Sequence, residues 1–333
     1  MRRALELAAL GPAVDPNPRV GAVITDSAGR VVGEGFHRGA GTAHAESVAL
    51  AQAGGDAVGG TAFVTLEPCN HTGRTGPCSR ALVDSGLSRV VYGQADPNPQ
   101  ASGGAATLRT AGVQVEGGLL AEEALTINQA WTFAMTHGRP RVVWKFAATL
   151  DGRSAAADGT SQWITGAAAR ADVHDLRARA GAILVGTGTV LADDPSLTVR
   201  HPDGSQRESQ PLRVVMGHRA IPDSARILDD SAPSLRLPHR DPTVGLAALA
   251  DRGIRQVWLE GGPTLAGAFV AAGLVDEVVA YLAPALLGAG RPAVEDLGIS
   301  TIGEALRLNP FDITMIGPDI RVRAGFDGSR KGM

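Results

Sequence analysis

The two cysteines of this 333-residue chain lie on either side of one short loop, in the stretch EPCNHTGRTGPC at residues 67–78. Cys69 and Cys78 are nine positions apart, so both thiolates reach one metal ion if the loop folds back. Zinc needs at least three protein ligands, and a catalytic site leaves the fourth position to water. His44, in the tripeptide HAE at 44–46, is the nearest third ligand. We therefore predict a zinc site formed by His44, Cys69 and Cys78.

The expected positions of these ligands favour the charged form that a metal requires. We expect a helix over 43–54 with Thr42 as its N-cap, and a second helix over 79–86 that Cys78 directly precedes. A helix N-terminus lowers the pKa of a nearby thiol. Two thiolates and a neutral imidazole balance the charge of Zn²⁺, and a water in the fourth position then ionises at a pKa of about 7.

Glu46 lies two residues after His44 and supplies a group that can move protons. Two residues span about 200° around an α-helix, so the two side chains converge only on something beyond the helix end. A water on the metal fits that requirement, and the carboxylate can pass its proton to a leaving nitrogen. Zinc nucleobase deaminases carry H-x-E followed by P-C-x-x-C. HAE and Pro68-Cys69 match, whereas eight residues instead of two separate the cysteines.

Two other interpretations of the cysteines remain. His71 lies inside the loop and, as a fourth ligand, would close the metal site to water; or the two thiols are buried and bind nothing. A closed structural site has no need of a carboxylate at Glu46, which favours the catalytic interpretation.

The elements that position these residues occupy the first of two halves. Single hydrophobic cores stop growing near about 250–300 residues, so the length favours two domains. Strand-like and helix-like segments alternate in both halves, and the stretch RPR at 139–141 follows a long expected helix over 119–138. We predict two α/β domains, 1–138 and 139–333. The clearest expected strands are 20–25, 61–66, 89–93, 142–152, 182–186, 211–217, 256–260 and 277–283.

Composition excludes several classes of partner. The net charge of −3 gives no electrostatic case for nucleic acid or for an anionic membrane. No apolar run reaches the roughly 18–20 residues of a membrane span. The start, MRRALELAALGP, fits an amphipathic helix better than a signal peptide, because its apolar run is short and contains Glu6. Two cysteines make no disulfide scaffold, and we expect a cytoplasmic protein.

The second half contains a candidate anion site. In EGGPTLAGAF (260–269), two glycines end an expected strand and Pro263 suits the first position of a helix, whose free N–H groups would meet an anion such as a cofactor pyrophosphate. A plain strand-to-helix turn is the alternative. GTGTVL (186–191) also follows a strand but lacks the third glycine of the dinucleotide fingerprint.

Taken together, these motifs resemble one known family over nearly the whole chain: bifunctional riboflavin-biosynthesis proteins, in which a pyrimidine deaminase is fused to a 5-amino-6-(5-phosphoribosylamino)uracil reductase. The resemblance implies a cytidine-deaminase-like first domain and a dihydrofolate-reductase-like second domain. The matching stretches are DPNPRVGAVI (15–24), GEGFHRGAGTAHAE (33–46), TLEPCNHTGRTGPC (65–78), DPNPQASGGA (96–105), KFAATLDGRSA (145–155), SQWITG (161–166), LRA (176–178), GTGTVLADDPSLTVR (186–200) and EGGPTLAGAF (260–269).

For the first domain, the resemblance implies that His44, Cys69 and Cys78 bind zinc and that Glu46 shuttles protons. The implied substrate is a small phosphorylated pyrimidine, 2,5-diamino-6-(5-phosphoribosylamino)pyrimidin-4-one. The positions that match family contacts to this substrate are Asn17, His37, His71 and Arg74.

For the second domain, the resemblance implies NADPH as the hydride source and a homo-oligomer, either a dimer or a tetramer. The positions resembling cofactor contacts are Ala147, Trp163, Thr189, Asp193, His218, Gly262, Pro263, Thr264, Leu265, Ala266, Gly267 and Ala268. The positions resembling substrate contacts are Ser161, Arg177, Leu197, Arg200 and Glu260. The two arginines suit phosphate clamps. Gly217 stands where the family usually has an aspartate, which leaves the role of His218 open.

Two rival functions stay open on the sequence. One is a zinc deaminase of another nucleobase or nucleoside, joined to an unrelated C-terminal ligand-binding domain. The other is a zinc-binding module without catalytic activity.

Overall fold

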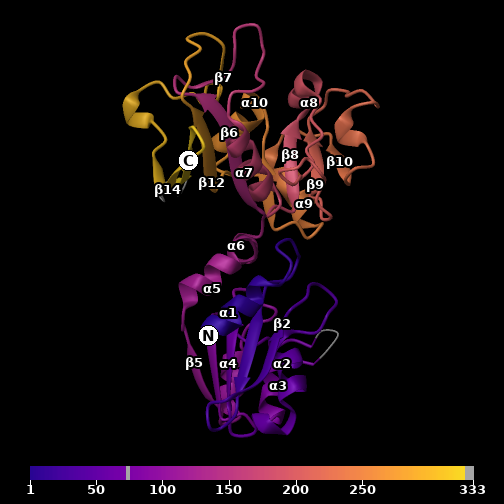
Figure 1. The fold of residues 1–333 in the computed structure, drawn as a ribbon, viewed down its shortest axis with the longest axis vertical. Coiled ribbons are helices and arrows are strands. Elements are labelled where there is room, and N and C mark those ends of the chain that lie inside the picture. The colour runs from indigo at the N-terminus through magenta and orange to yellow at the C-terminus, as the bar shows by residue number, and fades with distance from the viewer. Residues whose placement is uncertain (73–75, 327–333) are drawn as a thin grey trace. The chain divides into compact units, whose positions relative to one another are not determined.

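The structure, a computed structural model, describes residues 1–72 and 76–326. The chain divides into two compact units, Met1–Gly138 and Arg139–Met333, and each contains a β-sheet covered by helices (Figure 1). Two α/β units are the fold class that the sequence predicts. Within the described residues, no helix combines the length and the apolar character needed to cross a membrane.

The first unit contains a five-stranded sheet in the order β2-β1-β3-β4-β5. β1 is antiparallel to both β2 and β3, whereas β3, β4 and β5 run parallel. Its helices and strands are α1 (Arg2–Ala9), β1 (Gly21–Thr25), β2 (Val31–Phe36), α2 (Ala45–Ala53), β3 (Thr61–Leu66), α3 (Cys78–Asp84), β4 (Arg89–Gln94), α4 (Gly104–Thr110), β5 (Gln114–Gly117), α5 (Ala121–Ile127) and α6 (Gln129–His137).

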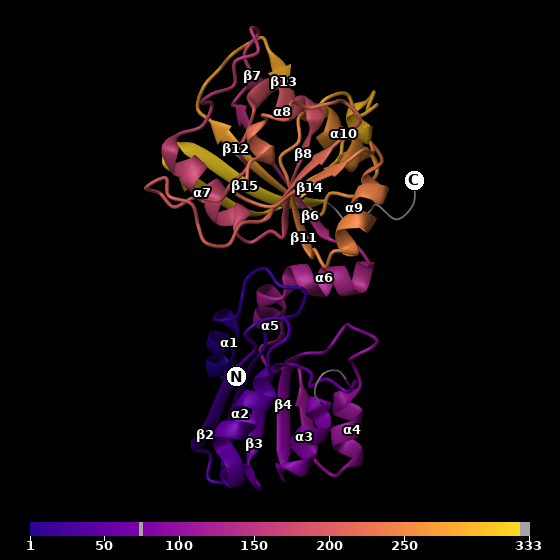
Figure 2. The same cartoon turned by 90° about the vertical axis from the view of Figure 1, so that its right-hand side faces the viewer.

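Alternating residues of the interior strand β1 fill the core on both faces of this sheet. Ala22 and Ile24 pack on the face covered by α2, α3 and α4, while Val23 packs against α1 on the other face (Figure 2). Gly35 in β2 lets α2 come close, since a Cβ there would lie 2.4 Å from the carbonyl oxygen of Ala45. The backbone that carries the start of α2 is therefore held directly against the sheet.

Three expected helix boundaries differ from the structure. His44 itself is the N-cap of α2, and the Thr42 hydroxyl donates instead to the carbonyl of Gly39. Cys78 is the first residue of α3 rather than the residue before it. The single helix expected over 119–138 is two helices, α5 and α6, with Asn128 between them. The Asn128 side chain forms two hydrogen bonds with the backbone of Arg19, just before β1, and these bonds interrupt the helix.

The second unit contains an eight-stranded sheet in the order β10-β9-β8-β11-β6-β12-β15-β14. The six strands from β10 to β12 are parallel, and β15 and β14 are antiparallel. A two-stranded ribbon, β7 with β13, accompanies it. The elements are β6 (Arg141–Thr149), β7 (Arg153–Ala155), α7 (Ala167–Arg177), β8 (Ala182–Gly186), α8 (Thr187–Asp193), β9 (Leu212–Met216), β10 (Ser234–Leu237), α9 (Pro242–Ala250), β11 (Gln256–Leu259), α10 (Pro263–Ala271), β12 (Glu277–Ala283), β13 (Arg291–Pro292), β14 (Leu308–Ile316) and β15 (Asp319–Phe326).

Helices cover both faces of the parallel part of this sheet, as they must when parallel strands are joined by crossovers. Trp144 of β6 packs with α9 and α10, whereas its neighbour Val143 packs with α7. Because the strands are parallel, the segments that follow β8, β9 and β11 all leave the same edge of the sheet. That edge is where ligands bind in open α/β sheets.

Candidate active sites

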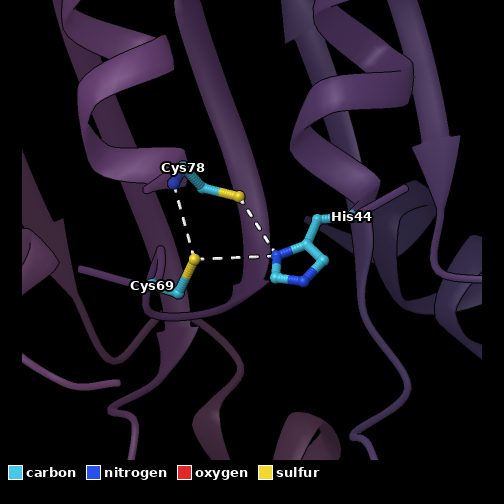
Figure 3. Close-up of side chains that lie close together, drawn as sticks. All are labelled: His44, Cys69 and Cys78. Carbon is cyan, nitrogen blue, oxygen red and sulfur yellow. Dashed lines mark hydrogen bonds between the residues drawn. The ribbon is translucent and has the colours of Figure 1, made fainter. Parts of the chain in front are cut away.

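The predicted zinc ligands come together at the ends of three elements of the first unit. His44 precedes α2, Cys69 follows β3, and Cys78 opens α3; Figure 3 shows the imidazole ring turned toward both sulfurs. The Nδ1 atom of His44 lies 3.3 Å from the Cys78 sulfur and 3.6 Å from the Cys69 sulfur. A tetrahedral zinc ion, bound about 2.3 Å from sulfur and about 2.0 Å from nitrogen, separates such atoms by about 3.5 Å. The three donors therefore fit zinc.

The charges of these donors also suit a divalent cation. A hydrogen bond from the Cys78 thiol, and another from His44, lower the pKa of Cys69 to about 4. Donation to the Cys69 sulfur, together with burial, raises the pKa of Cys78. The hydrogen bond with Cys69 raises the pKa of His44. The two sulfurs alone thus share one negative charge, and a cation between them would allow both to ionise.

Glu46 lies beside this cluster and is almost completely buried, at 4% exposure. Its burial raises the pKa of the carboxyl group, which is within hydrogen-bonding reach of the Cys78 thiol. His44 and Glu46 therefore both reach the cysteine pair, although they are only two residues apart at the start of α2. A buried carboxyl next to a metal site can accept and return a proton.

Asn17 and His37 form a pair beside the imidazole of His44. The Asn17 side-chain nitrogen lies 3.3 Å from Nε2 of His37, and Nδ1 of His37 lies 3.1 Å from the carbonyl oxygen of Ala43. The rings of His37 and His44 are 5.5 Å apart, edge to face. His37 is buried and thus links Asn17 to the backbone just before the metal ligand.

The remaining first-unit candidates lie elsewhere or cannot be placed. His71 is exposed, and in the described part of the chain the donor cluster contains only His44, Cys69 and Cys78. A closed zinc site with His71 as a fourth ligand is therefore disfavoured. Arg74 lies outside the described residues.

Glu67, next to Pro68-Cys69, is a buried carboxylate that the sequence analysis missed. It accepts backbone hydrogen bonds from Asp96, Gly103 and Ala105, and so holds the loop before α4 against the cysteine segment. Gly104 is required there, because a Cβ would lie 1.8 Å from the carbonyl oxygen of Pro68. The stretch DPNPQASGGA thus supports the Cys69 backbone, a role that no local pattern indicates.

In the second unit, the two glycine-containing turns meet at the carboxyl edge of the parallel strands. The Gly262 N–H, at the N-cap of α10, donates to the Thr189 hydroxyl of α8 over 3.0 Å. Pro263 is the first residue of α10, as the sequence predicts. The turn after β8 and the turn after β11 therefore form one surface, and the next strand, β9, ends beside it.

Four charged or polar side chains form a buried cluster near this edge: Lys145 on β6, Trp258 on β11, Glu260 just after β11, and Arg177 at the end of α7. Arg177 donates two hydrogen bonds to Glu260, of 2.5 and 2.7 Å, and the Trp258 indole N–H donates a third of 2.5 Å. Despite burial, the charge of Arg177 holds the pKa of Glu260 near 2. Burial lowers the pKa of Lys145 on β6, although the negative charge of Glu260 opposes that change. The cluster thus combines the guanidinium of Arg177, the amine of Lys145 and the carboxylate of Glu260.

A second arginine near this edge, Arg200, is positioned by α7. Its backbone N–H lies 3.3 Å from Nδ1 of His174, and its Nε donates to the Thr198 hydroxyl over 3.2 Å. The Thr198 carbonyl in turn accepts from Arg177. Burial and the charge of Arg177 lower the pKa of His174 to about 4, so the ring is neutral and free to accept.

Comparison with known proteins identifies both units. The model for the cytidine and deoxycytidylate deaminase zinc-binding region matches residues 1–94, and the model for the RibD C-terminal domain matches residues 140–322. The riboflavin biosynthesis protein RibD of Mycobacterium tuberculosis is 53% identical over 306 residues, 92% of this chain and 90% of the relative. The chain belongs to the RibD family.

Other RibD proteins cover nearly the whole chain. The Escherichia coli protein is 42% identical, with 96% of each chain covered. The solved structure of Acinetobacter baumannii RibD has a TM-score of 0.90 at 40% identity, over 98% of this chain and 97% of that one. A Thermotoga maritima structure described as a diaminohydroxyphosphoribosylaminopyrimidine deaminase/5-amino-6-(5-phosphoribosylamino)uracil reductase has a TM-score of 0.88 at 32% identity, with the same coverage. The chain is thus a bifunctional deaminase and reductase of riboflavin biosynthesis.

The other reductase positions predicted from the RibD resemblance differ in their surroundings. Trp163 is 69% exposed, and the Arg170 guanidinium lies over its ring at 4.6 Å. Ala266 is fully buried in the core beneath α10, so its side chain packs against the sheet. Leu197 is buried with a positive φ of 49°. Among the rest, Ser161, Ala147, Thr189 and Gly262 are partly buried, Asp193, His218 and Thr264 are exposed, and Pro263, Leu265, Gly267 and Ala268 lie within α10.

Proposed function

We propose that the chain catalyses hydrolytic deamination of 2,5-diamino-6-(5-phosphoribosylamino)pyrimidin-4-one, followed by NADPH-dependent reduction of the ribosyl group to ribityl. The observation that carries the first step is the fit of His44, Cys69 and Cys78 to zinc beside the buried Glu46. The Thermotoga relative supports the pair of steps, since its description names both activities. Residues 1–138 are assigned to the deaminase and residues 139–333 to the reductase.

In the deaminase unit, each residue has a distinct task. His44, Cys69 and Cys78 hold zinc, which supplies a Lewis acid that makes water nucleophilic near neutral pH. Glu46 takes the proton of the attacking water and delivers it to the departing nitrogen. Its burial raises the pKa of the carboxyl, which helps it to hold that proton between the two transfers. Asn17, supported by His37, orients the pyrimidine ring.

In the reductase unit, the carboxyl edge of the sheet binds both ligands. Thr189 and the first turn of α10 hold the cofactor, which supplies the hydride. Arg200 binds the substrate phosphate, because Arg177 already gives its paired donors to Glu260. Arg177 instead keeps Glu260 ionised, at a pKa near 2, so that this carboxylate accepts hydrogen bonds from the substrate.

The assembly and location belong to the same proposal. Phe311, Ile313 and Met315 alternate along the edge strand β14, so they share one face, and each is about 60% exposed or more. Such a row on a sheet edge favours pairing with another chain, and we propose a homo-oligomer, a dimer or a tetramer. Both cysteines are free, which fits a cytoplasmic enzyme.

The test is turnover of the diaminopyrimidine substrate by the zinc-loaded full chain, with and without NADPH. We expect ammonia release without NADPH, and the ribityl product only when NADPH is added. Deamination of cytidine or adenine nucleosides in place of this substrate would support the rival nucleoside deaminase. A protein that binds zinc but releases no ammonia from any of these compounds would be a non-catalytic zinc module.

The domain assignment has a separate test. A Glu46→Gln full-length protein, given the deaminated intermediate, should still oxidise NADPH at the wild-type rate. Failure of that reaction in a soluble, zinc-loaded protein would contradict the assignment of the two steps to separate units.

A further inference from the structure

Arg219 lies three residues after the end of β9, against the first turn of α8, which follows β8. Gly217 turns the chain with a φ of +136°, in close contact with the side chain of Thr187. A Cβ on Gly188 would lie only 2.6 Å from the Nη2 atom of Arg219. The guanidinium therefore rests on the backbone of the first turn of α8, at the residue next to Thr189.

The charge of this guanidinium is not neutralised by the protein. Arg219 is exposed, and no carboxylate in residues 1–72 or 76–326 forms an ion pair with it. The other exposed arginines of this unit, such as Arg179 and Arg252, likewise form no ion pair within the described residues, so Arg219 is distinguished by its position against Gly188. A guanidinium offers five N–H donors in a planar fork that matches a phosphate group. Arg219 thus presents an unused phosphate-binding group at the carboxyl edge of the sheet.

The order of groups along that edge indicates which phosphate it meets. The substrate-side cluster of Lys145 and Glu260 belongs to β6 and the end of β11. Gly262 and Thr189 join the turns after β11 and β8. Arg219 follows β9, one strand beyond β8, and neighbouring strands are about 4.8 Å apart.

A nicotinamide dinucleotide has the same linear order. Its nicotinamide must reach the substrate, its pyrophosphate lies in the middle, and its adenosine ribose lies at the far end. With the pyrophosphate at Gly262 and Thr189, the adenosine ribose falls on the β9 side, beside Arg219. NADPH carries a phosphate on the 2′ oxygen of that ribose, whereas NADH carries a hydroxyl.

We infer that Arg219 binds the 2′-phosphate of the cofactor and makes the reductase unit select NADPH over NADH. The inference rests on the proposed reductase function and adds the residue that sets its cofactor specificity. Charge-assisted hydrogen bonds to the phosphate are lost with NADH, since a hydroxyl accepts them only weakly.

The test measures binding directly, by isothermal titration calorimetry on the zinc-loaded full chain. The probes are adenosine 2′,5′-bisphosphate and adenosine 5′-monophosphate, which differ only in the 2′-phosphate. We expect Arg219→Ala to weaken binding of the bisphosphate by about 10- to 100-fold and to leave binding of the monophosphate unchanged. Arg219→Lys should keep part of the preference, because an ammonium retains the charge but not the fork.

Arg252→Ala is the matched control. Arg252 is an exposed arginine of the same unit, but it lies just before β11 begins, at the opposite edge of the sheet. We expect it to bind both probes as the wild type does. The ratio of kcat/KM for NADPH to that for NADH should fall in Arg219→Ala by the same factor as the binding ratio.

The outcomes separate this inference from the proposed function. If Arg219→Ala still prefers the bisphosphate over the monophosphate as strongly as the wild type does, another residue binds the 2′-phosphate and the inference is wrong. If the wild type reduces its substrate equally well with either cofactor and binds both probes alike, the reductase function stands and the inference fails. If no reduction occurs with either cofactor, the proposed function fails, and the inference with it.

Discussion

Glu260→Gln should strongly destabilise the second unit, because it removes the negative charge of a buried cluster. Glu260 accepts hydrogen bonds from Arg177 and Trp258, and its side chain is only 10% exposed. Glutamine has nearly the same shape but is neutral, so the substitution leaves no cavity. It leaves the Arg177 guanidinium buried without an opposite charge, and removing one partner of a buried ion pair in this way is strongly destabilising.

The pKa of Glu260 gives the magnitude. Desolvation raises the pKa, but the charge and hydrogen bonds of Arg177, together with Lys145 and the Trp258 indole, outweigh it, and the value falls from 4.5 to about 2. Such a change corresponds to about 3 kcal/mol of folding free energy, which is close to the ~3–5 kcal/mol measured when one partner of a buried pair is removed. For a unit of this size, about 3 kcal/mol lowers the melting temperature by roughly 6–12 °C.

The assay is urea unfolding at pH 7, followed by tryptophan fluorescence, since Trp144 and Trp258 are both buried in the second unit. Asp175→Asn is the control: Asp175 lies on the same helix as Arg177 and pairs with Arg207, but it is 59% exposed. Exposed pairs contribute about 0–1 kcal/mol, so the control should hardly change the midpoint. If the urea concentration at the unfolding midpoint is the same for Glu260→Gln as for Asp175→Asn, the role of this cluster in stability is refuted.

The pH dependence has a defined sign. Because the pKa of Glu260 is depressed in the folded protein, its contribution to stability is complete above about pH 4.5 and is lost as the pH falls toward 2. The difference between wild type and Glu260→Gln should therefore be constant from pH 5 to pH 8 and should shrink below pH 4.5.

Three further predictions concern the two sites. Cys78→Ser should lose most of the bound zinc, which metal analysis of the purified protein measures; a full equivalent of zinc in the variant would contradict the ligand assignment. Glu46→Gln should retain zinc yet release ammonia about 10²–10⁴-fold more slowly, and near-normal release would assign proton transfer to another group. His174→Phe removes the acceptor of the Arg200 N–H and should raise the reductase KM for the phosphorylated substrate more than it lowers kcat. His174→Gln keeps an acceptor and should restore the KM. Equal effects of both variants would refute the positioning role of His174.

The fold class and most strand centres could be predicted because they depend on local patterns. The apolar runs at 61–66, 182–186 and 277–283 are strands over the same residues. The break between α5 and α6 could not be predicted in this way. It depends on hydrogen bonds between Asn128 and the backbone of a residue 109 positions earlier, and that segment otherwise has the composition of one long helix.

The same distinction applies to the sites. His44 and the two cysteines could be identified from the sequence because metal ligation permits few residue types, and those types are rare in this chain. Arg177 and Glu260 are 83 residues apart, and arginines are numerous here, so only the fold indicates that they pair. The sequence assigned no role to His174 or to Lys145, although Lys145 begins a matching stretch, because their roles depend on the groups that the fold places beside them.

This difference follows from where each unit obtains its chemistry. In the deaminase unit, the protein itself must supply the metal ligands and the proton carrier. These groups are therefore histidine, cysteine and glutamate residues in short motifs, which a sequence reveals. In the reductase unit, a cofactor brings the hydride, and the protein contributes only binding, orientation and charge. Backbone N–H groups in the first turn of α10, and ordinary arginines such as Arg219, are sufficient for that task. Cofactor specificity in this chain is therefore a property of the order of strand ends along one sheet edge, which no short motif encodes.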